Sequence, residues 1–497
     1  MILLMTLSML LINLPSARAS TDELLLQLQC TSFLKKFDRI VSHTATGDAQ
    51  ASPVTGFPYL RTSRFLVSFR DQVMGQAALR QWLGMMRQLD AQARAMEWSH
   101  LDAEWQAFIA AAKPVVMGNS STMEAISQCG RYLVTKDLAK PDRLKALRDV
   151  VQVAGDYQVW KRITGLYYLT RYATLDGIEK LAELTHERYR SKLDELMPVA
   201  TRKIFTPQAT SFLGTDQLRS LMQNISRNPL QIPLPSKKQA ELLLQHYAPV
   251  WVPGQTSEND SIGKPSWLTD QSWPYVDTQQ PVTYTLLSHT RFQGITLLQL
   301  VYTIWFPGRT AESAIDSLAG HLDGITWRVT LDPQGQPLIY DSMHNCGCYH
   351  LFFPVADSGL EPEPVNADSA TVEERALVPQ QVATLQQGER VHLYITAGSH
   401  DLVRVRVRRP EPSSVSYELE DYNELRSLAT ESDVRRSLFD PAGLVPGTER
   451  LESLYLWPMG VLRPGAMRQW GHHATAFVGR RHFDQPDLME RYFVYRQ

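Results

Sequence analysis

The stretch "GITLLQLVYTIWF" (294–306) decides the fold class, because it is a long run of aliphatic, β-branched and aromatic residues. A similar run, "VTYTLLS" (282–288), precedes it, and "ITWRVTL" (325–331) follows it. Runs of this composition, separated by short polar segments, are typical of β-strands. We expect these strands to pair with their neighbours in a mostly antiparallel sheet.

The pattern continues towards the C-terminus. The turn signal "DPQG" (332–335) is followed by a return strand within "LIYDSMHNCGCYHLFF" (338–353), and then by an acidic, Pro-rich linker (358–374). "RVHLYITAGSHDLVRVRV" (390–407) predicts two strands around a central turn. We therefore predict an antiparallel β domain over residues 248–410. Residues 411–497 are predicted to form a mixed segment of short helices and loops that packs on it.

The chain before residue 248 has a different, helical period. Ser121 and Glu124 form a capping-box pattern, and Pro141 stands where a helix begins. Tyr167, Tyr168 and Tyr172 form an aromatic stripe that we interpret as packing. We predict an all-α domain over residues 20–247 and hence an α+β protein. The segments that carry the helical pattern are 21–41, 120–134, 140–173, 176–196 and 236–247.

The N-terminus resembles a secretory signal in its physical pattern. An apolar run over residues 2–14 is too short for a comfortable membrane span, and Ala17 and Ala19 form an A-x-A cleavage pattern. We predict a signal peptide over residues 1–19 and an exported, periplasmic protein. No Lys or Arg precedes the apolar run, so an uncleaved N-terminal anchor is the alternative.

The charge balance excludes some partners. With 50 basic and 52 acidic residues the formal net charge is −2, so no nucleic-acid partner is expected. The alternating stretch "VRVRVRR" (403–409) places Arg404, Arg406 and Arg408 on one face of a strand. These arginines are candidates for binding an anionic ligand or an envelope component; the alternative is a solvated edge strand protected by its charges.

The four cysteines admit several pairings. Export would permit disulfides, and the placement of Cys30 and Cys129 in the helical part favours a bond between them. Cys346 and Cys348 would then pair with each other or bind a metal ion.

The motif "HNCGCYH" (344–350) is the candidate site. His344, Cys346, Cys348 and His350 alternate, so on a flat strand they would share one face and offer zinc or copper ligands. The outer histidines of a straight strand would lie about 20 Å apart, too far for one ion, so Gly347 must bend the chain or other ligands must help. A strained disulfide and simple burial are the alternatives.

A second stretch, "RQWGHHATAFVGRRHF" (468–483), could complete that site. His472, His473 and His482 are candidate additional ligands, and Arg480 and Arg481 are candidate anion contacts. Asp341 could orient a ligating imidazole. The alternative for the stretch is a basic surface loop.

No nucleophile elbow, P-loop, dinucleotide fingerprint, H-E-x-x-H or haem-attachment motif is present in the sequence, so whether the chain is an enzyme stays open. Two hypotheses follow. The first is an exported protein with a metal-binding or redox-active Cys/His site in its β-rich part. The second is a non-enzymatic envelope scaffold or binding protein whose cysteines form structural disulfides.

Overall fold

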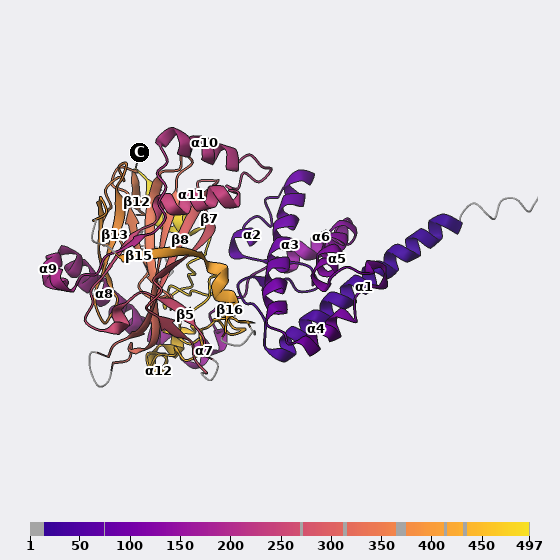
Figure 1. Ribbon diagram of the computed structural model, residues 1–497, viewed down its shortest axis with the longest axis horizontal. Coiled ribbons are helices and arrows are strands. Elements are labelled where there is room, and N and C mark those ends of the chain that lie inside the picture. The colour runs from indigo at the N-terminus through magenta and orange to yellow at the C-terminus, as the bar shows by residue number, and fades with distance from the viewer. Residues whose placement is uncertain are drawn as a thin grey trace, which may run out of the picture. The chain divides into compact units, whose positions relative to one another are not determined.

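The computed structural model divides the chain into two compact units, Met1–Val153 and Ala154–Gln497 (Figure 1). The first 13 residues of the predicted signal peptide and most of the acidic linker are not described. The described residues are 14–73, 75–268, 272–311, 316–363, 374–411, 415–430 and 435–496.

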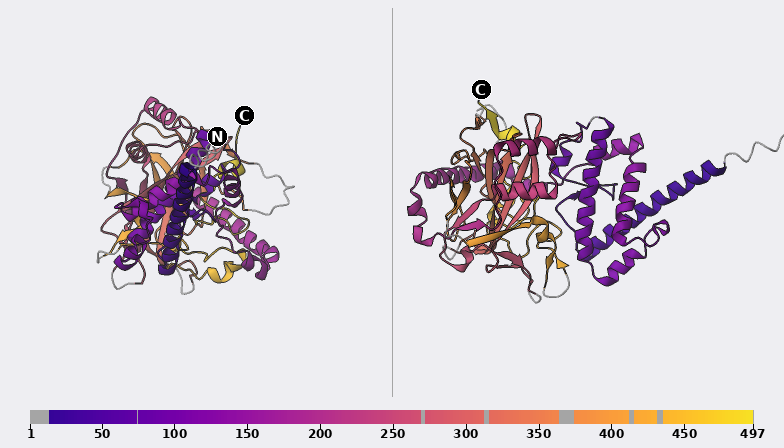
Figure 2. Two further views of the ribbon diagram at one scale, coloured as in Figure 1. Left: turned by 90° about the vertical axis from the view of Figure 1, so that its right-hand side faces the viewer. Right: turned by 45° about the horizontal axis from the view of Figure 1, so that its top comes forward.

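The first unit is helical, as its period predicts. Its helix α1 runs through the expected cleavage point after Ala19 and crosses the other helices of the unit (Figure 2). The capping box of Ser121 and Glu124 is present at the start of α5. The elements are α1 (Leu14–Thr44), β1 (Ser52–Pro53), β2 (Arg61–Thr62), α2 (Arg64–Val67), α3 (Gln76–Ser99), α4 (Ala103–Ala110), η1 (Val115–Met117), α5 (Thr122–Lys136) and α6 (Pro141–Val150).

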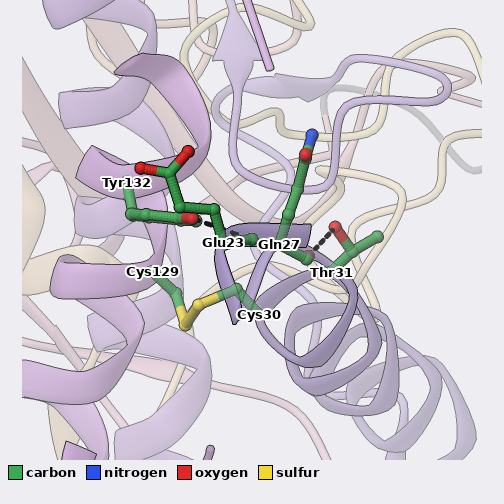
Figure 3. Close-up of a disulfide and its surroundings, with 6 residues drawn as sticks. All are labelled: Glu23, Gln27, Cys30, Thr31, Cys129 and Tyr132. Carbon is green, nitrogen blue, oxygen red and sulfur yellow. Dashed lines mark hydrogen bonds between the residues drawn. A yellow bond between two sulfur atoms is a disulfide. The ribbon is translucent and has the colours of Figure 1, made fainter. Parts of the chain in front are cut away.

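A disulfide between Cys30 and Cys129 ties α1 to α5 (Figure 3). This is the pairing that the sequence favoured. Both cysteines are fully buried, and their sequence separation is 99 residues. Nearby, the hydroxyl of Tyr132 donates a hydrogen bond to the carbonyl of Glu23, so a polar contact accompanies the covalent one.

The second unit is built on a ten-stranded sheet in the order β11-β10-β9-β8-β7-β15-β3-β4-β13-β14. Neighbouring strands from β11 to β7 pair antiparallel, whereas β7–β15, β15–β3 and β4–β13 pair parallel. The strands are β3 (Phe205–Pro207), β4 (Val250–Pro253), β7 (Val282–Phe292), β8 (Ile295–Arg309), β9 (Gly320–Leu331), β10 (Pro337–His344), β11 (Leu351–Pro354), β13 (Arg390–Ile395), β14 (Leu402–Arg408) and β15 (Val415–Asp421).

The sheet is therefore mixed, with three parallel pairings beside six antiparallel ones, so the prediction of a mostly antiparallel sheet holds only in part. The hydrophobic periodicity located the long strands correctly, but pairing direction depends on which distant segments meet. β3 and β15 enter the middle of the sheet from outside the predicted β domain, and they bring parallel pairs with them.

The sheet curls, and its two edges are brought together by side chains and one extended segment. Leu377 and Val382 form bridges to β11, while the side chain of Gln380 bonds the backbone of Val405 in β14. Tyr189 donates a hydrogen bond to the carbonyl of Leu402 in β14 and packs against Phe353 of β11. The largest buried apolar cluster of the unit fills this curl.

Helices cover the sheet and belong to its unit. Tyr247 of α11 donates to the carbonyl of Gly335 in the β9–β10 turn, and Met222 of α10 packs there too. The helical elements are α7 (Val159–Thr164), α8 (Tyr167–Arg190), α9 (Leu193–Leu196), η2 (Val199–Thr201), α10 (Thr215–Ile225), α11 (Lys237–Tyr247), η3 (Glu258–Asp260), η4 (Tyr422–Arg426), α12 (Ser453–Leu456), η5 (Trp457–Met459) and α13 (Leu488–Tyr492).

The division between the units thus differs from the expected boundary near residue 247. The helices from α7 to α11 have amphipathic patterns like those of the first unit, and periodicity cannot tell which core a helix covers. The described residues also form four short two-stranded sheets. No described helix has the length and apolarity that a membrane span requires. Those outside the first unit use β5 (Lys264–Ser266), β6 (Tyr275–Asp277), β12 (Leu360–Pro362), β16 (Leu428–Ala429), β17 (Arg435–Arg436) and β18 (Phe493–Tyr495).

A candidate thiol site at the β10–β11 turn

The "HNCGCYH" motif forms the turn between β10 and β11. His344 ends β10, and its backbone N–H bonds the carbonyl of Cys348 at 3.0 Å, while the N–H of Gly347 bonds the carbonyl of His344 at 2.7 Å. Gly347 has φ +95°, and a Cβ there would lie 2.5 Å from the carbonyl oxygen of Ala474. Glycine is therefore required twice, by the backbone conformation and by a close backbone approach. The predicted bend at Gly347 is present.

The two cysteines in this turn are free thiols whose sulfurs interact. The backbone N–H of Cys348 lies 3.4 Å from the sulfur of Cys346. This N–H and the neighbouring Cys348 side chain, with a contribution from His344, hold the pKa of Cys346 below its ordinary value against the opposing effect of burial. The Cys346 side chain and burial raise the pKa of Cys348. Negative charge is thus favoured on Cys346 and disfavoured on Cys348.

His344 lies between two carboxylates. Its Nδ1 is 3.6 Å from Asp323 Oδ1, and its Nε2 is 3.8 Å from Asp401 Oδ1. The ring is buried and tilts against Tyr349 at 5.0 Å between centroids. Asp323 comes from β9 and Asp401 from the β13–β14 turn, so three separate segments meet at this imidazole.

A second imidazole continues this arrangement. His400 Nδ1 lies 2.9 Å from Asp323 Oδ2, and His400 Nε2 lies 3.3 Å from Asp260 Oδ1. Burial lowers the pKa of His400, but the two carboxylates outweigh it and raise that pKa. Burial likewise raises the pKa of Asp323, and the hydrogen bonds of His344 and His400 outweigh it and hold the pKa well below its usual range. Asp260, His400, Asp323, His344 and Asp401 form a buried chain that we call the Asp–His chain.

The end of the Asp–His chain opens on a small pocket. Nε2 of His344 and Oδ1 of Asp401 have no hydrogen-bond partner among the described residues, and both side chains line it. The pocket has about 20 Å³ of space, which is room for roughly one water-sized group. Arg188, at its rim, binds the other oxygen of Asp401 at 2.7 Å.

Two further charged groups lie near the thiols. Arg309, at the end of β8, donates to the carbonyl of Ser399 at 2.9 Å. Burial lowers its pKa, and nearby acidic groups, among them Asp323 and Cys346, outweigh this and raise it. Burial and the charge on Cys346 raise the pKa of Glu452 to about 7. The site is therefore rich in groups that can hold or release a proton near neutral pH.

His350, the last residue of the motif, faces a different partner. Its Nε2 lies 2.9 Å from Asp341 Oδ2, and Arg328 binds the same carboxylate. Burial lowers the pKa of His350 to about 4 despite this carboxylate, so the ring is neutral at pH 7. Asp341 orients an imidazole, as the sequence suggested, but His350 and His344 do not converge on one point. The chain bends at Gly347, so the flat strand on which all four side chains would share one face is not formed.

The 468–483 stretch contacts the turn through the backbone of Ala474 and through Arg468, whose Nε donates to the carbonyl of Cys346 at 2.9 Å, while its imidazoles bind elsewhere. His472 Nδ1 and His482 Nε2 lie 2.9 and 3.1 Å from the two oxygens of Asp156. His473 is buried, and burial lowers its pKa to about 3. The side chain of Arg481 is buried and donates to the carbonyl of Thr475 at 2.7 Å.

Arg480 of the same stretch is exposed. The structure thus brings the backbone of the stretch to the turn but does not aim these candidate ligands at Cys346.

The arginine strip lies on β14 at one edge of the sheet, with Val403 and Val405 buried on the other face, as the alternation predicts. Arg404 donates to the carbonyl of Ser191 at 2.7 Å. Arg408 pairs with Glu411 at 2.9 Å and donates a hydrogen bond to the hydroxyl of Tyr394, whereas Arg406 is exposed.

Within the described ranges, no group of three or more His, Cys, Asp or Glu side chains is arranged to hold a metal ion. Cys346 and Cys348 lie two residues apart in the turn. His344 is the histidine of the motif whose charge affects the pKa of Cys346. A zinc or copper site at this turn would need a ligand from outside this set or a local rearrangement.

Sequence reasoning missed Asp260, Asp323, His400, Asp401 and Arg309. His400 and Asp401 stand together in the predicted turn "AGSHD", which was the available signal. Their partner Asp323 is 77 residues away from His400, and no local pattern encodes that pairing.

Comparison with known proteins does not add to this assignment. No protein-family model matches the sequence, and the searches of curated proteins and of solved structures find no significant similarity.

Proposed function

We propose that this chain is an exported protein whose second unit carries a redox-active dithiol, Cys346 and Cys348. The observation that carries the proposal is the geometry of the turn: two free cysteines two residues apart, with the backbone N–H of Cys348 3.4 Å from the sulfur of Cys346, held at a glycine bend beside His344. The Cys30–Cys129 disulfide supports export, because disulfides persist mainly in oxidising compartments.

The charge distribution supports separate roles for the two sulfurs. Cys346, whose pKa is lowered, would be the attacking thiolate, since the thiolate is the nucleophile in thiol–disulfide exchange. Cys348, whose pKa is raised, would stay protonated until the second step. Its partial exposure gives a small reagent a route to the pair.

The reaction with a small disulfide would take two steps. The thiolate of Cys346 attacks one sulfur of the substrate, a mixed disulfide forms and one substrate thiolate leaves. Cys348 then loses its proton to solvent and attacks the Cys346 sulfur, which releases the second substrate thiolate. The dithiol is oxidised by two electrons and the substrate disulfide is reduced. A bridge between residues two apart is strained, so the oxidised form would readily pass the disulfide on.

The test is incubation of the full chain with oxidised and reduced glutathione at graded ratios, with thiols counted by alkylation and mass spectrometry. We expect a Cys346–Cys348 disulfide that forms and reverses with the glutathione ratio. Cys348→Ser should stop at a mixed disulfide on Cys346. Two thiols that stay reduced at every ratio would contradict the proposal.

Metal content measured on the same preparation, purified without chelator, separates the alternatives. About one zinc or copper ion per chain, lost in Cys346→Ser, would assign the turn to metal binding instead. Unreactive thiols without metal would favour the scaffold hypothesis, in which Cys30–Cys129 is the structural bridge.

A further inference from the structure

An exposed apolar surface surrounds η5 in the second unit. α7, the start of α8 and α12 all pack against η5, and α7 and α12 lie close together in Figure 1. Ile163, Tyr168, Leu169 and Leu454 are 69, 76, 70 and 73 % exposed. We call this surface the η5 patch; its members, each more than half exposed, are Val159, Trp160, Ile163, Leu166, Tyr168, Leu169, Tyr172, Leu454 and Tyr455.

The patch is the outward face of helices whose inward face is already packed. Tyr167 of α8 is buried in a cluster with Met459 and Val478. Tyr168 and Tyr172 of the aromatic stripe point away from that cluster and are exposed. The packing interpretation of the stripe therefore holds only for Tyr167. Contiguous exposed apolar surfaces of this kind mark binding sites for proteins or membranes.

The junction of α7 and α8 adds a strained residue to the patch. Leu166 has φ +50°, a left-handed conformation that is unfavourable for a non-glycine residue, yet its side chain is 62 % exposed. The neighbouring Gly165 approaches Pro458 so closely that a Cβ would lie 2.6 Å from the proline Cβ. The bend is thus held by η5, while the side chain of Leu166 stays mostly exposed.

The basic side chains of the η5 patch favour an anionic partner. Residues 157–175 contain three basic side chains, Lys161, Arg162 and Arg171, and no Asp or Glu. Lys161 lies over the ring of Trp160 at 5.8 Å, and Arg171 lies 5.0 Å from the ring of Tyr172. Trp and Tyr with interleaved basic residues are typical of surfaces that enter the headgroup region of anionic bilayers.

We infer that the η5 patch docks this protein on an anionic phospholipid surface. Aromatic and aliphatic side chains would enter the headgroup layer, and Lys161 and Arg171 would meet lipid phosphates. This inference does not rest on the thiol chemistry, and neither of the two proposals depends on the other.

Flotation of the full chain with vesicles tests the inference. We expect binding to phosphatidylglycerol/phosphatidylethanolamine vesicles and much weaker binding to phosphatidylcholine vesicles. The triple variant Trp160→Ser, Tyr168→Ser and Leu169→Ser should bind the anionic vesicles at least about tenfold more weakly, because it removes apolar area from the contact. The matched control replaces exposed apolar residues elsewhere in the unit, Val199, Phe212 and Trp273, by Ser and should bind like the wild type.

A local probe separates the patch from the apolar N-terminus. In a chain with Cys346→Ser and Cys348→Ser, an environment-sensitive fluorophore on Leu169→Cys should shift to shorter wavelength with anionic vesicles. The same fluorophore on Val199→Cys should not shift.

Three results would overturn the inference. They are equal binding of the triple variant and the wild type, equal binding to neutral and anionic vesicles, or a chain that dimerises through the patch and binds no vesicles.

Discussion

The two pairs of cysteines in this molecule differ in their bonding. Cys30 and Cys129, 99 residues apart, are joined between two helices of the first unit, whereas Cys346 and Cys348, two residues apart, remain free thiols in the second. Closeness in sequence therefore did not decide which cysteines are bonded. The helices place the first pair with a Cα–Cα distance of 5.2 Å, within the range that a bridge requires, while the turn orders the second pair for hydrogen bonding.

The surroundings of the two pairs differ as well. The first pair is fully buried between helices of the first unit, and its sulfurs are bonded and do not titrate. The second lies beside the Asp–His chain, with His344 and Arg309 close enough to influence the charge on Cys346. We infer that the first pair serves stability and the second serves chemistry, and the following changes test this difference.

The largest effect is expected from the joint replacement Cys30→Ala and Cys129→Ala. A bridge that closes a loop of about 100 residues stabilises by roughly 4–5 kcal/mol, so the first unit should unfold at much lower denaturant concentration. Urea unfolding followed by circular dichroism measures this. Cys346→Ser with Cys348→Ser is the matched control and should leave that transition unchanged; an equal loss in both variants would contradict the assignment.

Gly347→Ala should destabilise the second unit by about 3 kcal/mol, because it combines a left-handed residue with a clash. The added Cβ would lie 2.5 Å from the carbonyl oxygen of Ala474. Gly388 also has positive φ, +83°, but nothing lies within 4 Å of a Cβ there. Gly388→Ala should thus cost only about 1 kcal/mol. Similar losses, compared by thermal unfolding, would show that the turn is not packed as described.

His400 should make the second unit less stable as pH rises. Its folded-state pKa is raised, so its contribution is complete below the unfolded value of about 6.5 and is lost as pH rises through the folded value. The stability difference between wild type and His400→Gln should therefore shrink above about pH 6.5. Urea titrations at several pH values, read by tryptophan fluorescence, measure this difference.

His392 is expected to give the second unit the opposite dependence of stability on pH. Burial lowers its pKa to about 4, so its neutral form is favoured in the fold and stability rises with pH between about 4 and 6.5.

A wild-type advantage over His400→Gln that stayed constant from pH 6 to 9 would contradict the charged state assigned to His400.

The smallest effect is expected on thiol reactivity. In a Cys348→Ser chain, His344→Gln should raise the pKa of Cys346 by about half a unit and slow its alkylation roughly threefold at pH values below that pKa. Rates measured against pH with iodoacetamide give that pKa. His43→Gln, in the first unit, is the control. An unchanged profile in both variants would remove His344 from the site.

The sequence located most of the secondary structure. Runs of aliphatic, β-branched and aromatic residues marked β7, β8 and β9, and the capping box marked the start of α5, because these signals depend on neighbouring residues alone. It did not locate the division between the units, since α7 to α11 carry the same amphipathic pattern as helices of the first unit. The sequence predicted only part of the candidate site: it located the motif and the bend at Gly347, but it did not predict which residues pair with the histidines of the motif.

By itself, the amino-acid sequence determined local conformation and composition: which segments are helical or extended, where glycine must turn, and that two thiols stand two residues apart. Only the tertiary structure decided that His344 meets Asp323 and Asp401 while His350 meets Asp341. It also decided that β3 and β15 bring parallel pairs into the sheet. The physical reason is the sequence distance over which each kind of interaction acts. Backbone preferences act over a few residues, whereas ion pairs and strand partners depend on how segments distant in sequence pack together.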